Sequence, residues 1–368
     1  MSLRRLRVLL LFGGRSAEHE VSCVSAVAVA RGLDEAGYEV VPMGITREGR
    51  WLLAGEARAA LDKGRDALPE SFAVEGEPVF ASDCASLEPG GSGGRFDVAF
   101  PVLHGPFGED GTVQGFLELA GIPYVGSGVV GSAVGMDKVM MKRAFLACGL
   151  PSPCHLALRE DQRGSATAAR VEEELGYPCF VKPANLGSSV GVSKANDRGA
   201  LEVALDEAFG FDDWALVEES VSGREIEVSV LGDRPPVASL PGEVVPADEF
   251  YSYQDKYFDG KAELHAPARL EPRQVQEAQA LAIAGFEACR GEAMARVDLF
   301  LEESRSGGRP GRGFLLNEVN TIPGFTPISM YPKMWEATGL TPGELVDELV
   351  DAAISRHQHR AGRLGRPR

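Results

Sequence analysis

The stretch LLNEVNTIPGF, residues 315–325, begins like the end of a buried strand and finishes in a sharp turn. Side chains two apart on a strand point to the same face, so Glu318 and Asn320 are predicted to share one face. Pro323 and Gly324 then turn the chain away. An acid and an amide on one face of an otherwise apolar strand indicate a functional site rather than a core.

A second strand carries a matching pattern. In ARVDLFL, residues 295–301, Arg296 and Asp298 are predicted to share a face. If the two strands are neighbours, Asp298, Glu318 and Asn320 converge. Three oxygen donors without His or Cys suit Mg²⁺ or Mn²⁺, with phosphate oxygens of a substrate as further ligands. Two carboxylates ~4 Å apart repel by roughly 4 kcal/mol at an effective dielectric of about 20, so a counter-cation is required. Arg296, bridging the carboxylates, is the alternative to a metal.

A glycine- and serine-rich loop lies between two predicted strands in FVKPANLGSSVGVSK, residues 180–194. The first strand ends at Lys182 and the second begins at Val190. The loop lacks the G-K-[ST] of a Walker motif, and no helix follows it. Its backbone N–H groups can still close over phosphates, with Lys182 neutralising their charge. A plain hairpin turn fits the same residues.

A strand near residue 218 gives this loop a nucleotide context. The backbone edge from Glu218 to Val221 is predicted to pair with an adenine, and Glu225 to accept hydrogen bonds from ribose hydroxyls. Taken alone, each of these acids fits a solvated surface better.

The segment GSGVVG, residues 126–131, formally matches a dinucleotide-binding motif. That motif needs a solid strand before it and an acid about 20 residues after it. Only IPYV precedes the segment, and residues 146–151 are LACGLP. We interpret the segment as a tight turn that opens a helix, so a dinucleotide-dependent oxidoreductase is disfavoured.

The composition restricts the class of protein. A chain of 368 residues is expected to form two or three domains, and its net charge of −17 argues against nucleic acid as a partner. The six cysteines form no C-x-x-C pair, which disfavours a zinc site and a disulfide framework. The apolar run at 8–12 is too short for a signal peptide, and no stretch reaches the ~18 apolar residues of a membrane span. A cytoplasmic protein without membrane contact is expected, with a frayed, solvated basic tail after Ser355.

Alternating strand and helix patterns up to about residue 125 predict an α/β fold. The continuous apolar run RVLLLF, residues 7–12, is typical of a buried parallel strand. A second unit is predicted at 126–217 and a third at 218–368. The third unit is expected to contain strands within 216–220, 224–232, 294–301 and 313–319, and helices at about 272–289 and 342–356.

With these patterns the chain resembles the D-alanine–D-alanine ligases of the ATP-grasp superfamily. The resemblance rests on segments in family order from residue 11 to 332, namely LFGGRSAEHEVS, HGPFGEDGTVQG, VGMDK, KPANLGSSVGVSK, EFYSYQDKY, ARVDLFL and NEVNTIPGFTPISMYP. It implies a three-domain ATP-grasp fold: an N-terminal parallel-sheet domain (1–125), a central subdomain with the glycine-rich flap (126–217) and a C-terminal subdomain with the metal site and a lid loop (218–368).

The resemblance also implies the activity. These ligases join two D-alanines through an acyl phosphate for peptidoglycan precursor synthesis, with ATP as a substrate and two Mg²⁺ or Mn²⁺ ions. A homodimer is implied as well.

Site residues follow by the same likeness. Phosphate contacts are expected from Lys138, Lys182 and Lys256. Adenine and ribose contacts are expected from Glu218, Val221 and Glu225. The two metal ions are expected at Asp298, Glu318 and Asn320. The alanines are expected to meet Glu18, His104, Ser329 and Met330. An oxyanion is expected at Arg296 and Gly324, and a lid that closes on Glu18 at Ser188 and Tyr257.

Alternatives remain at the level of the substrate. Relatives that make D-alanyl-D-lactate often have a histidine where this chain has Tyr257, so the loop favours alanine as second substrate. A depsipeptide ligase with a tyrosine-like loop, or another ATP-grasp carboxylate–amine ligase, is the runner-up. A nucleotide-binding regulator without turnover has no reason to keep Arg296 and the Gly324 turn.

Overall fold

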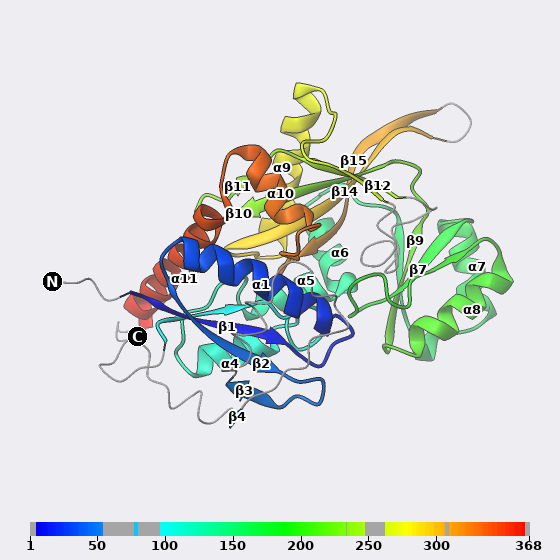
Figure 1. Cartoon of the computed structure of the whole chain (residues 1–368). Helices are drawn as coiled ribbons and strands as arrows, with labels where there is room; N and C mark the ends of the chain where they lie inside the picture. Colours follow the sequence, from blue (N-terminus) through cyan, green and yellow to red (C-terminus); the bar gives the residue numbers. More distant parts are fainter. Residues whose placement is uncertain are drawn as a thin grey trace.

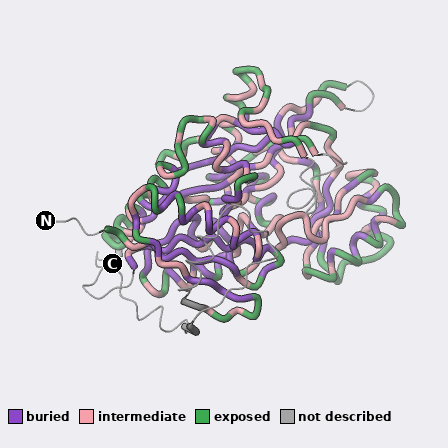
Figure 2. Tube along the Cα trace, viewed as in Figure 1, coloured by how far each residue is buried: buried purple, intermediate pink, exposed green. Residues whose placement is uncertain are grey.

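The computed structural model describes residues 5–53, 77–79, 96–232, 234–246, 262–305 and 309–364. Across these ranges the strands form three sheets, and helices cover them (Figure 1). Figure 2 shows that the buried stretches follow the strands, whereas the helices present exposed outer faces. The predicted α/β architecture with an N-terminal parallel sheet is confirmed.

The N-terminal part consists of β1 (Arg7–Gly13), α1 (His19–Glu35), β2 (Glu39–Ile45), β3 (Trp51–Leu53), β4 (Glu77–Val79), β5 (Val98–Pro101) and α4 (Thr112–Leu119). The sheet order is β4-β3-β2-β1-β5, with β2, β1 and β5 parallel. Alternate residues of β1 enter different cores: Val8 and Leu10 pack with residues of α1, and Leu9 and Leu11 pack with residues of α4. Because β1 is covered on both faces, its sequence is a continuous apolar run.

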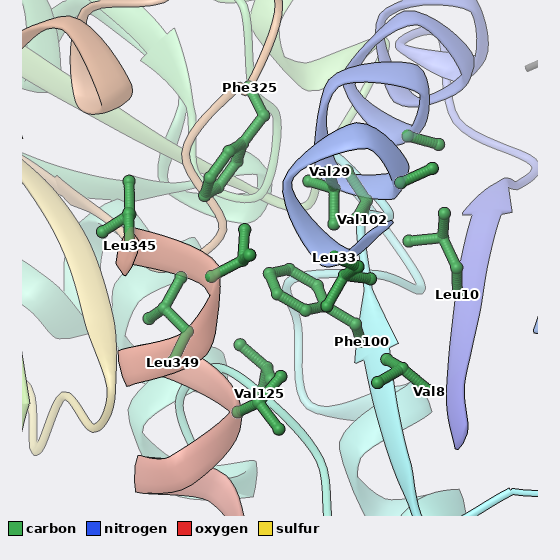
Figure 3. Packing of buried hydrophobic residues seen from close by; sticks show 14 of the residues in the cluster. Val8, Leu10, Val29, Leu33, Phe100, Val102, Val125, Phe325, Leu345 and Leu349 are labelled. Carbon is green, nitrogen blue, oxygen red and sulfur yellow. The ribbon is translucent and has the colours of Figure 1, made fainter. Parts of the chain in front are cut away.

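The C-terminal helix α11 (Pro342–Leu364) completes the core of the N-terminal sheet. Figure 3 shows Leu345 and Leu349 of α11 packed in one cluster with Phe100 and Val125. Phe325, directly after the Gly324 turn, joins this cluster, and its ring meets that of Phe100 edge to face with centroids 6.2 Å apart. Residues distant in sequence therefore anchor the turn that the sequence analysis singled out.

The prediction of a frayed tail after Ser355 is wrong for the residues that the structure describes. Helix α11 continues to Leu364, and Arg356 on it is only 7% exposed. Its guanidinium donates to the carbonyl oxygens of Tyr124 at 2.6 Å and Gly126 at 2.5 Å. A basic segment is solvated unless acceptors far along the chain are brought to it, and its own residues do not show such partners.

Replacing Arg356 by Met is expected to lower the free energy of unfolding by about 2 kcal/mol or more. The substitution leaves two buried carbonyl oxygens without their charged donor. Urea unfolding followed by fluorescence measures the change. Arg363→Met removes an exposed charge from the same helix and should stay within about 0.5 kcal/mol of the wild type. Equal stability of the two variants would contradict the assignment.

The central sheet consists of β6 (His155–Arg159), β7 (Cys179–Pro183), β8 (Ser193–Ala195) and β9 (Trp214–Glu219), with α7 (Ser165–Glu174), α8 (Arg198–Phe209) and a short 3₁₀ helix (Glu160–Gln162). Its order is β6-β9-β7-β8. The glycine-rich loop joins β7 to β8, an antiparallel pair, so the predicted strand–loop–strand arrangement is confirmed. The second strand begins at Ser193, however, and not at Val190 as predicted, because Val190 lies in a turn of the loop. Figure 1 shows this sheet, with α7 and α8, at the right of the molecule.

The C-terminal part consists of β10 (Arg224–Leu231), β11 (Val237–Ala238), β12 (Gly242–Val245), β13 (Glu263–His265), α9 (Pro272–Ala288), β14 (Met294–Arg305), β15 (Arg309–Asn320) and α10 (Met330–Thr338). The sheet order is β13-β12-β10-β14-β15, with β11 added to β10. Strands β14 and β15 are antiparallel neighbours, as the site prediction requires.

The chain between the N-terminal and central sheets forms α5 (Val129–Met136) and α6 (Lys138–Ala147). The glycine segment at 126–131 opens α5, which confirms its interpretation as a turn before a helix. Side chains of α6, Met141 and Phe145, pack in the core beneath β14 and β15.

Strand β9 corrects one expectation about organisation. The strand at 216–220 was expected among those of the third unit, but β9 pairs with β6 and β7 of the central sheet. Sheet membership depends on pairing with distant strands, which the strand's own residues do not specify. The division at 125/126 and 217/218 itself stays a prediction. Among the helices that the structure describes, none is both long and apolar enough to cross a bilayer.

Candidate functional site

The predicted site residues meet at one cavity of roughly 270 Å³. Strands of the central and C-terminal sheets line it, together with segments that follow strands of the N-terminal sheet. The predicted residues that line the cavity are Glu18, His104, Lys138, Lys182, Ser188, Glu218, Val221, Glu225, Arg296, Asp298, Glu318, Asn320, Gly324, Ser329 and Met330. Lys256 and Tyr257 lie outside the described residues.

The acids form a row across three neighbouring strands. Glu227 of β10 lies opposite Asp298 of β14, which lies opposite Glu318 of β15. All three residues line the cavity. Glu227 was missed by the sequence analysis, although its alternation with Glu225 on one strand face could have indicated it.

Arg296 supplies a cation to this row. Its guanidinium donates to both carboxylate oxygens of Asp298, at 2.7 Å each, and lies 3.3 Å from Glu227 Oε1. Burial lowers the pKa of Arg296, but the Asp298 and Glu227 charges outweigh burial and raise it well above its usual value. Asn320 also donates to Asp298 Oδ2, at 3.1 Å. The sequence analysis gave pairing of Arg296 with the carboxylates as the alternative to a metal ion. Arg296 does pair with one of them, Asp298.

The donor set nevertheless fits a hard divalent cation. Asp298 and Glu318 supply carboxylates, and Asn320 supplies an amide oxygen. In the part of the chain that the structure describes, no three His, Cys, Asp or Glu side chains are grouped to hold a metal ion. Two carboxylates and an amide leave coordination positions for substrate oxygens, as Mg²⁺ usually requires. The metal site therefore stays a prediction, supported by the chemistry of its donors.

A β-bulge alters which residues of β15 face the cavity. Asp298 pairs with Glu318, but Leu299 pairs with Leu316, so Asn317 is the extra residue. Both Asn317 and Glu318 line the cavity, and Lys182 Nζ lies 3.4 Å from Asn317 Oδ1. Simple alternation places Asn317 on the opposite face from Glu318, and the sequence analysis missed it for that reason.

Lysines gather at the glycine-rich loop. Lys138, the first residue of α6, donates from Nζ to the carbonyl oxygen of Leu186 within the loop. Lys182 Nζ lies 2.6 Å from Glu218 Oε2. Burial lowers the pKa of Lys182, but the charges of Glu218 and Glu318 outweigh burial and raise it. Lys182 is therefore a firmly protonated cation, suited to phosphate.

Strand β9 lies inside the central sheet, hydrogen-bonded to β6 and β7. Glu218 is therefore not at a free sheet edge, whereas Val221 lies beyond the end of the strand. The Glu219 side chain accepts hydrogen bonds from the Cys154 backbone N–H at 2.7 Å and from Arg312 at 2.5 Å. The bond from Arg312 attaches the end of β9 to β15, and that from Cys154 attaches it to the start of β6, close to where an adenine is predicted.

Glu18 also lines the cavity. Ser188 of the glycine-rich loop donates its hydroxyl to Glu18 Oε1, so the predicted link between these residues is present. A Cβ atom at Gly105 would lie 2.7 Å from Glu18 Oε2, and one at Gly187 would lie 2.6 Å from it. A side chain at either position would push the Glu18 carboxylate aside, and Gly105 in addition has a positive φ of 76° that favours glycine.

His104 supports the turn at Gly324. Its Nδ1 lies 3.0 Å from the carbonyl oxygen of Ile322, and its Nε2 lies 3.1 Å from Ser25 Oγ. Because a carbonyl only accepts, Nδ1 carries the proton. The backbone N–H of Phe325 donates to the same Ser25 hydroxyl at 3.2 Å. Burial lowers the pKa of His104, which favours the neutral ring.

Glu109 is a half-buried acid that the sequence analysis missed. Its carboxylate accepts from the backbone N–H groups of Gly105 at 2.7 Å and Ile322 at 3.1 Å. Burial, and then the nearby charge of Glu18, raise its pKa to about 8. Its place in the HGPFGEDG segment, beside His104, was the available signal.

The turn after β15 leads into α10. A Cβ atom at Gly324 would lie 2.7 Å from Ser329 Oγ, so a larger residue here would displace the Ser329 hydroxyl. Ser329 precedes the first residue of α10, Met330, and its hydroxyl accepts from the Thr326 N–H at 3.0 Å. The N-terminus of a helix attracts anions, so a substrate carboxylate fits here.

Comparisons with known proteins agree with this geometry. The family model described as "D-ala D-ala ligase N-terminus" matches residues 7–127, and that described as "D-ala D-ala ligase C-terminus" matches residues 144–351. The D-alanine–D-alanine ligase of Geobacillus kaustophilus is 44% identical over 361 residues, which cover 97% of this chain and 96% of that protein.

Solved structures of ligases also superpose on this chain. The D-alanine–D-alanine ligase from Coxiella burnetii superposes with a TM-score of 0.83 at 34% identity, covering 98% of this chain and 97% of that one. The VanG D-Ala:D-Ser ligase from Enterococcus faecalis superposes with a TM-score of 0.81 at 33% identity, covering 95% of this chain and 100% of that one. Since both halves of the family are matched in order and the curated relative aligns nearly end to end, the chain belongs to the D-alanine–D-alanine ligase family.

Proposed function

We propose that this protein joins two D-alanines into D-alanyl-D-alanine, with cleavage of ATP to ADP and phosphate, for peptidoglycan precursor synthesis. The observation that carries the proposal is the cavity itself. Lysines suited to phosphate, the acid row of β14 and β15, and Glu18 with its serine partner all line it. Membership of the ligase family supplies the substrates.

In the first step, a carboxylate oxygen of one D-alanine attacks the γ-phosphorus of ATP, and ADP leaves. Glu18 would hold the ammonium of this alanine, since its carboxylate is fixed by the loop and faces the cavity. Lys138 and Lys182 would hold the phosphates in line for transfer. Asp298, Glu318 and Asn320 would bind Mg²⁺ or Mn²⁺, whose charge offsets that of the triphosphate.

In the second step, the amine of the other D-alanine attacks the carbonyl of the acyl phosphate, and inorganic phosphate leaves. Arg296 stays protonated and would donate to the oxyanion, together with the Gly324 N–H. Ser329 and the Met330 N–H at the start of α10 would bind the second carboxylate. Ser188, and by likeness Tyr257, would close the site so that water does not hydrolyse the acyl phosphate, and Lys256 would by likeness add a phosphate contact.

The identity of the second substrate is the part of this proposal for which there is a specific alternative. The likeness to a D-Ala:D-Ser ligase is structural, at 33% identity, whereas the curated D-alanine–D-alanine ligase is 44% identical. D-Alanine is therefore favoured at the second position over D-serine and over the D-lactate of depsipeptide ligases. The homodimer implied by likeness is also proposed.

Phosphate release from ATP and Mg²⁺ tests the proposal. D-Alanine is expected to stimulate release strongly, L-alanine not at all, and D-serine or D-lactate together with D-alanine weakly. Mass spectrometry should find D-alanyl-D-alanine as the main product. Absence of stimulation by D-alanine would refute the proposal, and a mixed product of D-alanine with D-serine or D-lactate would replace it by a ligase of that specificity.

A further inference from the structure

Lys142 is a buried lysine that the mechanism above does not use. It lies on α6, one turn after Lys138, and is only 1% exposed. Lys138 lines the cavity, whereas Lys142 is not among the described residues that line it. A lysine is rarely this buried unless its charge is paired.

The partner of Lys142 is Glu218 of β9, itself 3% exposed. Lys142 Nζ lies 2.7 Å from Glu218 Oε1, while Lys182 Nζ lies 2.6 Å from the other oxygen, Oε2. One buried carboxylate thus bridges two ammonium groups. Lys142 Nζ also donates to the carbonyl oxygen of Leu316 at 3.3 Å, next to the bulge at Asn317.

The charges explain why the carboxylate can remain ionised here. Burial raises the pKa of Glu218, but Lys142 and Lys182 outweigh burial and hold that pKa at about 2. Lys182 in turn contacts Glu218 of β9 and Asn317 of β15, and it lines the cavity. The position of its ammonium therefore depends on where the Glu218 carboxylate points.

We infer that Lys142 is a positioning residue for ATP. The Lys142 ammonium occupies Glu218 Oε1, so that only Oε2 is left to hold Lys182 at the cavity wall. Without Lys142, the freed oxygen draws the Lys182 ammonium deeper toward β9 and away from the phosphates. This inference rests on the proposed contact between Lys182 and ATP.

The first test compares two probes, Mg²⁺-ATP and adenosine, by equilibrium binding to the purified full chain. Lys142→Met is expected to weaken ATP binding about 10- to 100-fold, the range of a charge-assisted contact. Adenosine lacks phosphates, so its affinity should stay within about twofold. A merely structural role would weaken both probes. Arg143→Met removes a charge from the exposed side of the same helix and should change neither.

The second test asks whether Lys142 acts through Lys182. In a Lys182→Met background, Lys142→Met should cause no further loss of ATP affinity, because the ammonium that it positions is gone. Additive losses would overturn the inference. Lys142→Arg keeps the buried charge and serves as a second folded variant. Its ATP affinity should fall between those of wild type and Lys142→Met, with adenosine binding unchanged.

The outcomes separate this inference from the proposed function. If D-alanine turnover is normal and Lys142→Met binds ATP like the wild type, the inference fails and the function stands. If the wild type binds ATP without D-alanine turnover, and Lys142→Met loses ATP selectively, the function fails and the inference stands.

Discussion

Glu318→Gln is expected to lower D-alanine-dependent phosphate release by about 10³-fold. Glutamine keeps the shape of the side chain but removes the charge opposite Asp298 that a divalent cation needs. A loss of this size matches the removal of one charge-stabilising group from a reacting centre. Steady-state phosphate release at saturating D-alanine, over a range of Mg²⁺ concentrations, measures the effect.

The fold of this variant is expected to persist. Glutamine removes the repulsion from Asp298 but also the attraction of the Glu318 charge for Lys182 and Arg296, two effects of opposite sign. Urea unfolding should therefore give a stability close to that of the wild type. Glu303→Gln changes an exposed acid on β14, the strand that carries Asp298, and should leave turnover unchanged. Full activity of Glu318→Gln would end the metal assignment.

Arg296→Lys is expected to lower kcat by about 10²–10³-fold, with little change in KM for ATP. Lysine keeps the buried positive charge but cannot donate through a planar fork to Asp298 and still reach an oxyanion. The expected loss is that of one oxyanion donor. Because a cation still faces Asp298 and Glu227, the protein should remain folded.

A matched control exists on the neighbouring strand. Arg224 of β10 makes a similar fork to Glu243, at 2.7 and 2.8 Å, but does not line the cavity. Arg224→Lys is therefore the same chemical change at a structural pair, and activity should stay within about twofold. If Arg296→Lys keeps more than a tenth of wild-type kcat, or if Arg224→Lys loses as much, the oxyanion role is refuted.

Much of the site could be predicted because strand alternation is a local property. The period of two placed Arg296 and Asp298 on one face, and Glu318 and Asn320 on another, and the strands did prove to be neighbours. Segments quoted for the family resemblance, together with the strand near residue 218, supplied the remaining residues, and those that the structure describes meet at one cavity. The parts assigned to Lys256 and Tyr257 stay predictions.

The residues and contacts that the sequence analysis did not predict share a different cause. Asn317 faces the cavity because β15 carries one residue more than β14 at that point, and a bulge is a property of two strands together. The paired lysines at Glu218 and the carbonyl partners of Arg356 come from segments 36 to 232 residues away. No pattern within either segment records such a partner.

The amino-acid sequence alone determined which strands are buried, which faces carry polar residues and which family of ligases the chain resembles. It could do so because backbone periodicity and hydrophobic burial act over a few residues at a time. The tertiary structure alone decided which buried or half-buried charges neutralise one another: Arg296 with Asp298, and Lys142 and Lys182 with Glu218. Electrostatic pairing depends on distance in space, and only the folded chain sets that distance.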